Sequence, residues 1–303
     1  MTSSTTLCTA LLYVVYLSSL LEVEMTSFQR VKEYIQSVPQ ESSAIAESSE
    51  SPIPKAWPSE GRLQVQKLTA GYSLDNEPVL KDIDLEVYPG KRVAIVGRSG
   101  SGKSSLIAST LRLIPKFHGE VVVDGVNLET VEAERLRQAV SFIPQNPTLF
   151  DGSLRFNLDF RGIVPDDDLR RILQEVVNND ENTASDWSLD RHIEAGGRNL
   201  SQGERQLVAL ARALVSDARI IIIDEATASL DEASEQRIQN LLRDKFSNKS
   251  LIAIAHRLNT VVDFDEVLVM EGGRVVERGN PRLLVESKEG VFWTLWQAMC
   301  KNE

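Results

Sequence analysis

A run of eight residues near position 100 has the types and the spacing that phosphate binding needs. The segment Gly97-Arg98-Ser99-Gly100-Ser101-Gly102-Lys103-Ser104 fits the pattern G-x-x-x-x-G-K-S and follows an apolar run typical of a buried strand. Its glycines permit a loop whose N–H groups point inward, because residues without a Cβ adopt positive φ easily. A helix predicted over Lys103–Leu113 adds the positive end of its dipole to this anion site.

The side chains of this loop are predicted to have separate roles. Lys103 is expected to reach the β- and γ-phosphates of a bound nucleotide, and the Ser104 hydroxyl to coordinate Mg²⁺. An ordinary Gly/Ser-rich turn between a strand and a helix is the alternative, and the complete match of the pattern argues against it. The predicted nucleotide-binding residues here are Gly97, Ser99, Gly100, Ser101, Gly102, Lys103, Ser104 and Ser105.

Two adjacent carboxylates follow a second apolar strand. Ile220–Ile223 is a β-branched run, typical of a central parallel strand, and Asp224 and Glu225 come directly after it. Asp224 is predicted to hold the Mg²⁺ shell, and Glu225 to act on a water that attacks the γ-phosphate. A positioned general base contributes about 10²- to 10⁴-fold in rate, so Glu225 is expected to carry turnover. The alternative is an acidic turn without chemistry.

The segment Leu200-Ser201-Gln202-Gly203-Glu204 predicts the start of a helix. Ser201 and Glu204 form an S-x-x-E capping box before an apolar-periodic stretch that ends at Val215. The N–H groups and the dipole at this helix start make a second anion site. Nothing in the pattern requires that this site serve the phosphate loop of the same chain. A capped surface helix is the alternative.

These motifs, in this order, resemble the ATP-binding cassette (ABC) family, whose signature LSGGQ stands here as LSQGE. In that family the signature serine and glycine contact the γ-phosphate bound to the opposite subunit. The resemblance therefore implies that Ser201 and Gly203 act in trans, and that ATP lies between two cassettes. Glu204 stands where the family has glutamine and adds a negative charge near that interface.

Four further positions match the family one at a time. The resemblance implies that Gln145 links Mg²⁺ and the attacking water to a helical subdomain, and that His256 contacts the γ-phosphate. It also implies that Asp231, after Ser229-Leu230, reaches across the dimer and that Tyr72 stacks on adenine. On the sequence alone each of these side chains has an ordinary structural alternative.

Finer details resemble subfamily C, the multidrug resistance-associated type, and its second, C-terminal cassette. They are Gly97-Arg98-Ser99, the stretches Ile143–Pro147 and Leu149–Arg155, and Ala255–Thr260. The presence of Glu225 favours a cassette that hydrolyses ATP. The resemblance implies an ATPase coupled to the transport of organic anions or xenobiotics, with ATP and Mg²⁺ as cofactors.

The resemblance spans about Gly61 to Lys301 and implies an α/β fold. That fold is a P-loop NTPase with a RecA-like core, an antiparallel β subdomain and an α-helical subdomain inserted at about 146–215. The apolar patterns agree with it. They predict strands at Leu63–Leu68, Leu85–Val87, Arg92–Val96, Gly119–Val123, Val140–Ile143, Leu251–Ile254, Glu266–Met270 and Arg274–Arg278, and helices at Asp166–Val177, Ser201–Val215 and Val291–Met299.

The N-terminal residues predict the end of a transmembrane helix. Leu7–Leu21 is almost wholly apolar, yet it gives roughly 22 Å of helix against a hydrocarbon core of about 30 Å. No basic residue precedes Arg30, although a signal peptide needs one. We therefore expect residues 1–38 to end the last transmembrane helix of an exporter and to extend into the cytoplasm. An amphipathic helix packed on the cassette is the alternative.

The remaining composition sets the expected domains and partners. Residues 39–60, rich in Ser, Glu and Pro, are predicted to be a flexible linker, and 61–303 the nucleotide-binding domain. The net charge of −11 argues against a nucleic-acid partner. Cys8 and Cys300 are the only cysteines, which indicates a reducing compartment. The expected partners are a second cassette, in cis or in trans, and the transmembrane domains of an exporter.

Three other functions stay open at this point. A soluble cassette ATPase of translation or DNA maintenance would share every motif, but the acidic charge and the apolar N-terminus argue against it. A P-loop kinase or GTPase would lack the signature and His256. A truncated fragment would have no transport activity of its own. The predicted location is a membrane, with the ATPase domain on the cytoplasmic side.

Overall fold

The computed structural model describes residues 2–38, 53–54, 56–73, 75–177, 187–216, 218–224, 232–255 and 258–300. It separates the chain into two compact units, Met1–Ala44 and Ile45–Glu303. Three predicted site residues, Glu225, Asp231 and His256, lie outside the described residues.

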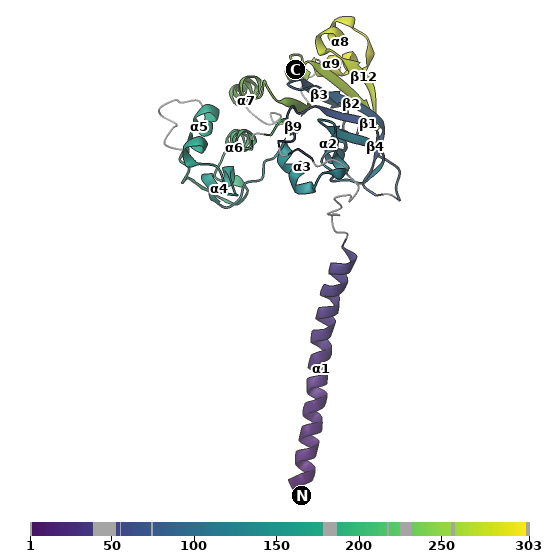
Figure 1. Cartoon of the computed structure of the whole chain (residues 1–303), viewed down its shortest axis with the longest axis vertical. Helices are drawn as coiled ribbons and strands as arrows, with labels where there is room; N and C mark the ends of the chain where they lie inside the picture. The colour runs from purple at the N-terminus through teal and green to yellow at the C-terminus, as the bar shows by residue number, and fades with distance from the viewer. Residues whose placement is uncertain are drawn as a thin grey trace. The chain divides into compact units, whose positions relative to one another are not determined.

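The described part of the first unit contains one continuous helix, α1 (Thr2–Ser37; Figure 1). Its side chains are exposed from residue 6 to residue 38. Within it, Thr6–Ser37 is long and apolar enough to cross a membrane by length and composition. A signal sequence near an N-terminus meets the same criteria, so this finding does not separate the two. The assignment of residues 1–38 to a transmembrane helix and its extension stays a prediction.

A six-stranded sheet forms the centre of the second unit. Its strands are β3 (Arg92–Gly97), β6 (Val140–Ile143), β9 (Ile220–Asp224), β10 (Ser250–Ile254), β11 (Glu266–Glu271) and β12 (Arg274–Gly279). They follow the order β12-β11-β3-β10-β9-β6, and every pair is parallel except β11 with β12. The central strands are nearly continuous apolar runs because both of their faces are covered.

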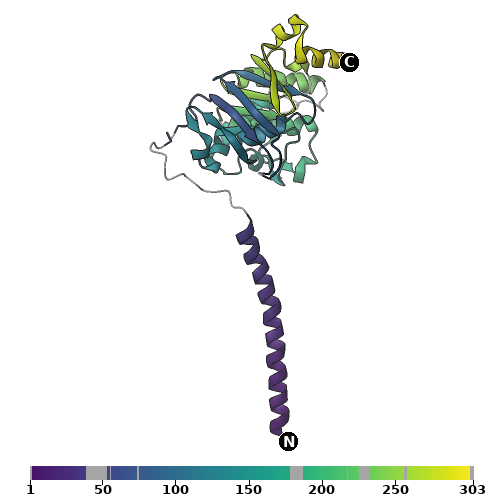
Figure 2. The same cartoon turned by 90° about the vertical axis from the view of Figure 1, so that its right-hand side faces the viewer.

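A second, antiparallel sheet has the order β2-β1-β4-β5. It contains β1 (Leu63–Ala70), β2 (Leu80–Val87), β4 (Lys116–Val123) and β5 (Val126–Asn127), and Figure 2 shows these strands, in blue and teal, in front of the parallel strands. The indole Nε1 of Trp57 donates to Val123 O at 2.9 Å, so the entry to the domain is fixed to this sheet. A short pair, β7 (Gly152–Ser153) and β8 (His192–Ile193), lies apart.

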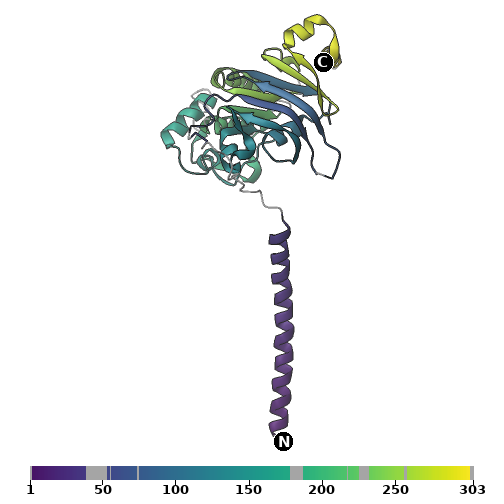
Figure 3. The same cartoon turned by 45° about the vertical axis from the view of Figure 1, so that its right-hand side comes forward.

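Eight α-helices are described in the second unit. They are α2 (Lys103–Thr110), α3 (Ala133–Ala139), α4 (Leu154–Leu158), α5 (Asp166–Val177), α6 (Gln202–Val215), α7 (Glu232–Lys245), α8 (Pro281–Ser287) and α9 (Gly290–Cys300). Figures 1 and 3 show α4, α5 and α6, in teal, gathered at one end of the unit, away from the yellow α8 and α9.

The prediction of a helix over Lys103–Leu113 was too long. The helix α2 ends at Thr110, and Arg112 has a positive φ of 56°. Ile114 precedes Pro115, and a residue before proline is disfavoured in the α conformation. The chain therefore turns into β4 earlier than the apolar pattern indicates. Strand β2 is longer than predicted, since it begins at Leu80.

Strand β9 separates two buried cores. Ile220 and Ile222 pack in a cluster formed by both sheets with α2 and α3. Ile221 and Ile223 pack in a second cluster that joins β9 to α4, α5, α6 and α7. This alternation follows from the two-residue period of a strand. One strand therefore supports the phosphate-loop side of the molecule and the helical side at once.

Candidate functional site

Four neighbouring strands of the parallel sheet bring the predicted motifs to one edge. Ile254 of β10 lies opposite Ile95 of β3 and Asp224 of β9, and Ile143 of β6 lies opposite Ile223. Parallel strands end at the same edge of a sheet, so the segments that follow them leave side by side. The phosphate loop follows β3, and Asp224 closes β9. Gln145 comes after β6, and His256 is two residues beyond the end of β10.

The phosphate loop has a backbone that only glycine fits at its first position. Gly97 has a φ of 154°, and a Cβ there would lie 2.3 Å from Met270 O. The N–H of Ser101 donates to Arg98 O at 3.2 Å and closes the turn. Gly102, with a φ of 103°, precedes α2 without a side-chain cap. The positive end of α2 is therefore left for an external acceptor.

Lys103 lies over this loop rather than away from it. Only 6% of its surface is exposed, and its Nζ donates to Gly97 O at 2.8 Å and to Arg98 O at 3.0 Å. The ammonium group is therefore held where the loop and α2 present their N–H groups, which suits a triphosphate.

A cavity of about 250 Å³ opens beside the loop. It is lined by Val79, Ser99, Gly100, Gly102, Lys103, Ser104 and Ser105, of which all except Val79 were predicted from the sequence. Ser101 differs from its neighbours, since its Oγ is buried and has no partner among the described residues. The Tyr72 hydroxyl lies 3.1 Å from Ser105 Oγ, and the residue is 64% exposed. An exposed ring beside a phosphate cavity can accept a stacked base.

The turn between β11 and β12 fixes the phosphate loop to β2. The N–H of Gly273 donates to Ser101 O at 3.1 Å, and Gly273 O accepts from the N–H of Lys81 at 2.8 Å. A Cβ on Gly273 would lie 2.0 Å from Val79 O, so no side chain fits. The sequence predicts this turn from its glycines but gives no sign of its contact with the loop.

The predicted Mg²⁺ ligands supply a set of oxygen donors. The Ser104 hydroxyl and the Gln145 amide belong to exposed residues, and Asp224 is half-buried at the end of β9. Hydroxyl, carboxylate and amide oxygens are the donors that Mg²⁺ takes, together with phosphate oxygens and water. No group of three or more His, Cys, Asp or Glu residues that could hold a metal occurs in the described part of the chain. The donor types fit an ion that a nucleotide brings with it.

The predicted helix start at Ser201 is confirmed. The N–H of Glu204 donates to Ser201 Oγ at 3.2 Å, and the N–H of Ser201 donates to Glu204 Oε2 at 2.7 Å. Ser201 is exposed and Gly203 is half-buried, so this end of α6 is open to a partner. The helix runs for 14 residues from this capped end.

The negative charge of Glu204 is compensated within the chain. Both terminal nitrogens of the Arg191 guanidinium donate to Glu204 Oε1 at 3.3 Å. Burial raises the pKa of Glu204, but the hydrogen bonds from Ser201 and the charge of Arg191 outweigh burial and hold the pKa below the usual value. The departure from the family's glutamine therefore leaves this helix end without an unpaired charge.

Gln206 belongs to the site although the sequence pattern did not indicate it. Its side chain is 1% exposed, and its Nε2 donates to the backbone oxygen of Gln145 at 2.6 Å and to that of Pro144 at 3.3 Å. The helix α6 is thus bonded to the segment that carries Gln145. The partners of Gln206 are backbone atoms, which no side-chain motif encodes.

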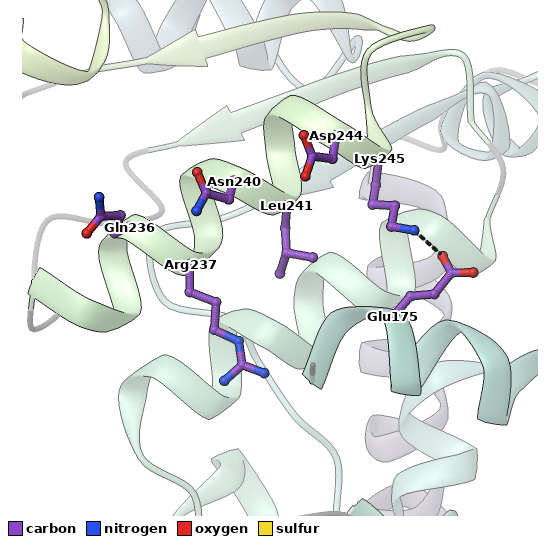
Figure 4. Close-up of a pocket in the computed structure, with 7 residues that line it drawn as sticks. All are labelled: Glu175, Gln236, Arg237, Asn240, Leu241, Asp244 and Lys245. Atoms are coloured by element: carbon purple, nitrogen blue, oxygen red, sulfur yellow. Dashed lines mark ion pairs between the residues drawn. The ribbon is translucent and has the colours of Figure 1, made fainter. Parts of the chain in front are cut away.

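A larger groove, of about 410 Å³, lies between α5 and α7 (Figure 4). Two of its cations have partners on α5: Lys245 forms an ion pair with Glu175 at 3.0 Å, and Arg237 Nη2 donates to Val176 O at 3.3 Å, although Arg237 Nε is buried without a partner among the described residues. Both cations approach the last turn of α5, where the helix dipole is negative. This groove therefore serves helix packing and is separate from the phosphate cavity.

One α/β core carries a phosphate loop that requires glycine, an acidic residue at a strand end and a capped helix. Together these features define a P-loop nucleotide-binding domain. Residues 80–228 match the family model described as ABC transporter. The chain therefore carries an ATP-binding domain of the ABC transporter family. This finding confirms the predicted family and the fold class.

Known relatives agree with this assignment. The chain is 39% identical to ATP-binding cassette transporter abc1 of Schizosaccharomyces pombe, over 92% of this chain and 20% of that protein. It is 37% identical to ABC transporter C family member 12 of Dictyostelium discoideum, over 89% of this chain and 20% of that protein. The chain spans about a fifth of the length of these relatives.

A solved structure shares the fold. The structure of a bacterial Atm1-family ABC exporter with ATP bound matches with a TM-score of 0.72 and 31% identity, over 79% of this chain and 42% of that chain. The roles assigned to single residues, such as Tyr72, Gln145 and Asp224, stay predictions.

Proposed function

We propose that this chain is the nucleotide-binding cassette of a subfamily C exporter, and that it hydrolyses ATP to power the transport of organic anions or xenobiotics. The observation that carries the proposal is the shared sheet edge, where the phosphate loop, Asp224 and the segment with Gln145 lie at the same ends of the parallel strands β3, β9 and β6. The likeness to an ATP-bound exporter and to a C family transporter supports it. The transport step and its substrates belong to the remaining part of such a protein.

The proposed chemistry is in-line attack of water on the γ-phosphate. Glu225 would orient the water and accept its proton, while Lys103 and His256 would stabilise charge on the transferred group. Ser104, Asp224 and Gln145 would hold Mg²⁺. When bound there, the ion would supply positive charge that offsets the negative charge developing on the transferred phosphoryl group.

The site needs a second cassette to be complete. The exposed, capped start of α6 presents Ser201 and Gly203 to a partner, where the dipole of the helix would meet the γ-phosphate held by the other phosphate loop. Asp231 would reach across the same interface. The partner is a second cassette, in cis or in trans.

The proposed architecture has three parts. Residues 1–38 end a transmembrane helix and extend it into the cytoplasm, 39–60 form a linker, and 61–303 form the cassette with its helical subdomain at about 146–215. The transmembrane domains of the exporter are the second partner, and the cassette lies on the cytoplasmic side of the membrane. Flotation of the full chain with lipid vesicles tests this placement, and a chain that stays unbound would favour a soluble cassette ATPase.

Mg-ATPase activity of the full chain, compared with that of Glu225→Gln, tests the proposed reaction. The variant is expected to bind ATP as the parent does, to lose turnover by about 10²-fold or more, and to accumulate as an ATP-bound dimer. Nucleotide binding by fluorescence and dimer formation by size-exclusion chromatography measure both effects. Equal ATPase activity in the two proteins would remove Glu225 from the mechanism.

A further inference from the structure

The helix α6 binds the segment that follows β6 at two points. Near the start of the helix, Gln206 donates to the backbone oxygens of Pro144 and Gln145. Further along, Arg212 donates from Nη1 to Thr148 O at 2.8 Å. A single helix thus fixes both the beginning and a later part of this segment.

The two anchors differ in character. Arg212 also binds both the backbone oxygen and Oδ1 of Asn157, the latter at 2.8 Å, and its burial lowers the pKa of its guanidinium. Asn157 in turn bonds to Phe150 O and to Ser153 O. Arg212 therefore belongs to a network that holds the segment at Thr148 and beyond, away from Gln145. Gln206 is hydrogen-bonded to the backbone of Gln145 itself.

Only the donor half of the Gln206 amide is satisfied. Its Oε1 is buried and has no partner among the described residues. A buried acceptor without a hydrogen bond is destabilising, and a purely structural position could carry an apolar side chain of the same length. The amide is therefore explained by its donor side, which faces two consecutive carbonyl oxygens and sets the direction of the backbone at Gln145.

We propose that Gln206 is a positioning residue that couples the two half-sites of the cassette. Ser201 caps the same helix and faces the partner's ATP, whereas Gln145 faces the Mg²⁺ of its own chain. A helix is rigid over its first turns, so any movement of Ser201 carries Gln206 and, through its hydrogen bonds, the Gln145 backbone. This inference rests on the proposed function, since it assigns Gln145 to Mg²⁺ and Ser201 to the partner.

Gln206→Met in the full chain tests the coupling, because methionine keeps the length and loses the donor. We expect ATP affinity without Mg²⁺ to stay within about twofold, and kcat to fall about tenfold with little change in KM. The Mg²⁺ concentration for half-maximal ATPase activity should rise about five- to tenfold. The backbone amides of residues 145–149, apart from Pro147, which has no N–H, should exchange hydrogen for deuterium faster than in the parent.

Two matched variants separate positioning from stability. Val208→Ala removes two methyl groups from a fully buried side chain of the same helix that has no hydrogen bond to Gln145. It should lower the melting temperature yet leave the Mg²⁺ dependence and the exchange at 145–149 unchanged. Gln206→Glu offers only acceptors to the two carbonyl oxygens when ionised, so it should be at least as defective as Gln206→Met. Val208→Ala with the same Mg²⁺ shift as Gln206→Met would overturn the proposal.

The outcomes distinguish this inference from the proposed function. A parent protein without Mg-ATPase activity contradicts the function, whereas an active parent matched by Gln206→Met contradicts only the positioning role. Should Gln206→Met fail to fold, exchange is compared in Glu225→Gln with and without MgATP. The coupling requires protection of 145–149 and of the first turn of α6 together, and protection of one alone would overturn it.

Discussion

Lys103 is nearly buried, and its ammonium group donates to two carbonyl oxygens of its own loop. This placement prepares the charge for a triphosphate, so Lys103→Met should weaken ATP binding about 10- to 100-fold, the range of a lost charged hydrogen bond. Titration with a fluorescent ATP analogue measures the effect. Lys91→Met is the control, because Lys91 pairs with Asp265 at 2.8 Å and is expected to leave ATP affinity unchanged. Equal affinity in Lys103→Met would contradict the role.

Glu204 makes the helix start sensitive to pH. Its pKa is held below the usual value in the folded chain, so its charge stabilises the fold above the unfolded-state pKa of 4.5 and loses this effect as the pH falls through the folded value. Glu204→Gln keeps the capping acceptor but not the charge, and should cost up to about 1 kcal/mol at pH 7. Urea unfolding from pH 7 towards pH 3.5 should show the two proteins converge. A constant difference would assign the effect to packing.

The sequence locates the nucleotide cavity well at the residue scale and misses its supports. The lining residues between 99 and 105 form one contiguous motif, and such a motif encodes its own loop geometry. Gln206 could not be found in this way, because its acceptors are backbone oxygens some 61 and 62 positions earlier in the chain. Any residue type presents a backbone oxygen, so the pairing exists only in the folded molecule.

The glycine turn between β11 and β12 allows an element-scale test with adjacent residues. Gly272→Ala meets no atom within 4 Å and should cost about 1 to 2 kcal/mol for its positive φ alone. Gly273→Ala places a Cβ 2.0 Å from Val79 O, so the turn must release Ser101 and Lys81. It should cost about 3 kcal/mol or more, and it alone should weaken ATP binding. Urea unfolding and ATP titration of both variants decide this. Equal ATP affinities would show that the turn does not support the loop.

Elements that pack along their whole length were predicted, and those shaped by tertiary contacts were not. The helix α5 matches its prediction from Asp166 to Val177 because one face is apolar and its first turn is acidic. The helix α7 was not predicted, since the part of it whose burial is described has only Ile238, Leu241 and Leu242 as buried apolar residues. Its position is set by packing on β9 and α6, and the local sequence pattern does not predict this contact.

The molecule contains two partial sites, the phosphate cavity and the Ser201 end of α6. In the proposed function the first binds ATP of its own chain and the second contacts ATP of the partner. The phosphate cavity lies at the edge of the parallel sheet. The helix α6, which begins at the Ser201 cap, packs in the core on the other side of β9. A two-fold dimer would supply each phosphate loop with the partner's α6, because a two-fold interface exchanges the same pair of surfaces. Defects in the two partial sites should then complement each other between chains.

A mixture of two inactive variants tests this arrangement. Lys103→Met lacks a working phosphate loop, and Ser201→Asp keeps a good helix cap but opposes the γ-phosphate with a negative charge. Each alone should be inactive. A 1:1 mixture forms mixed dimers in which one of the two sites is intact, so ATPase activity should return to about a quarter of the parent value. As a control, the double variant Lys103→Met/Ser201→Asp is mixed with the single variant Lys103→Met. No chain in this mixture has a working phosphate loop, so no ATPase activity should return. If the single-variant mixture is equally silent while both chains are folded, Ser201 does not act on the partner's ATP.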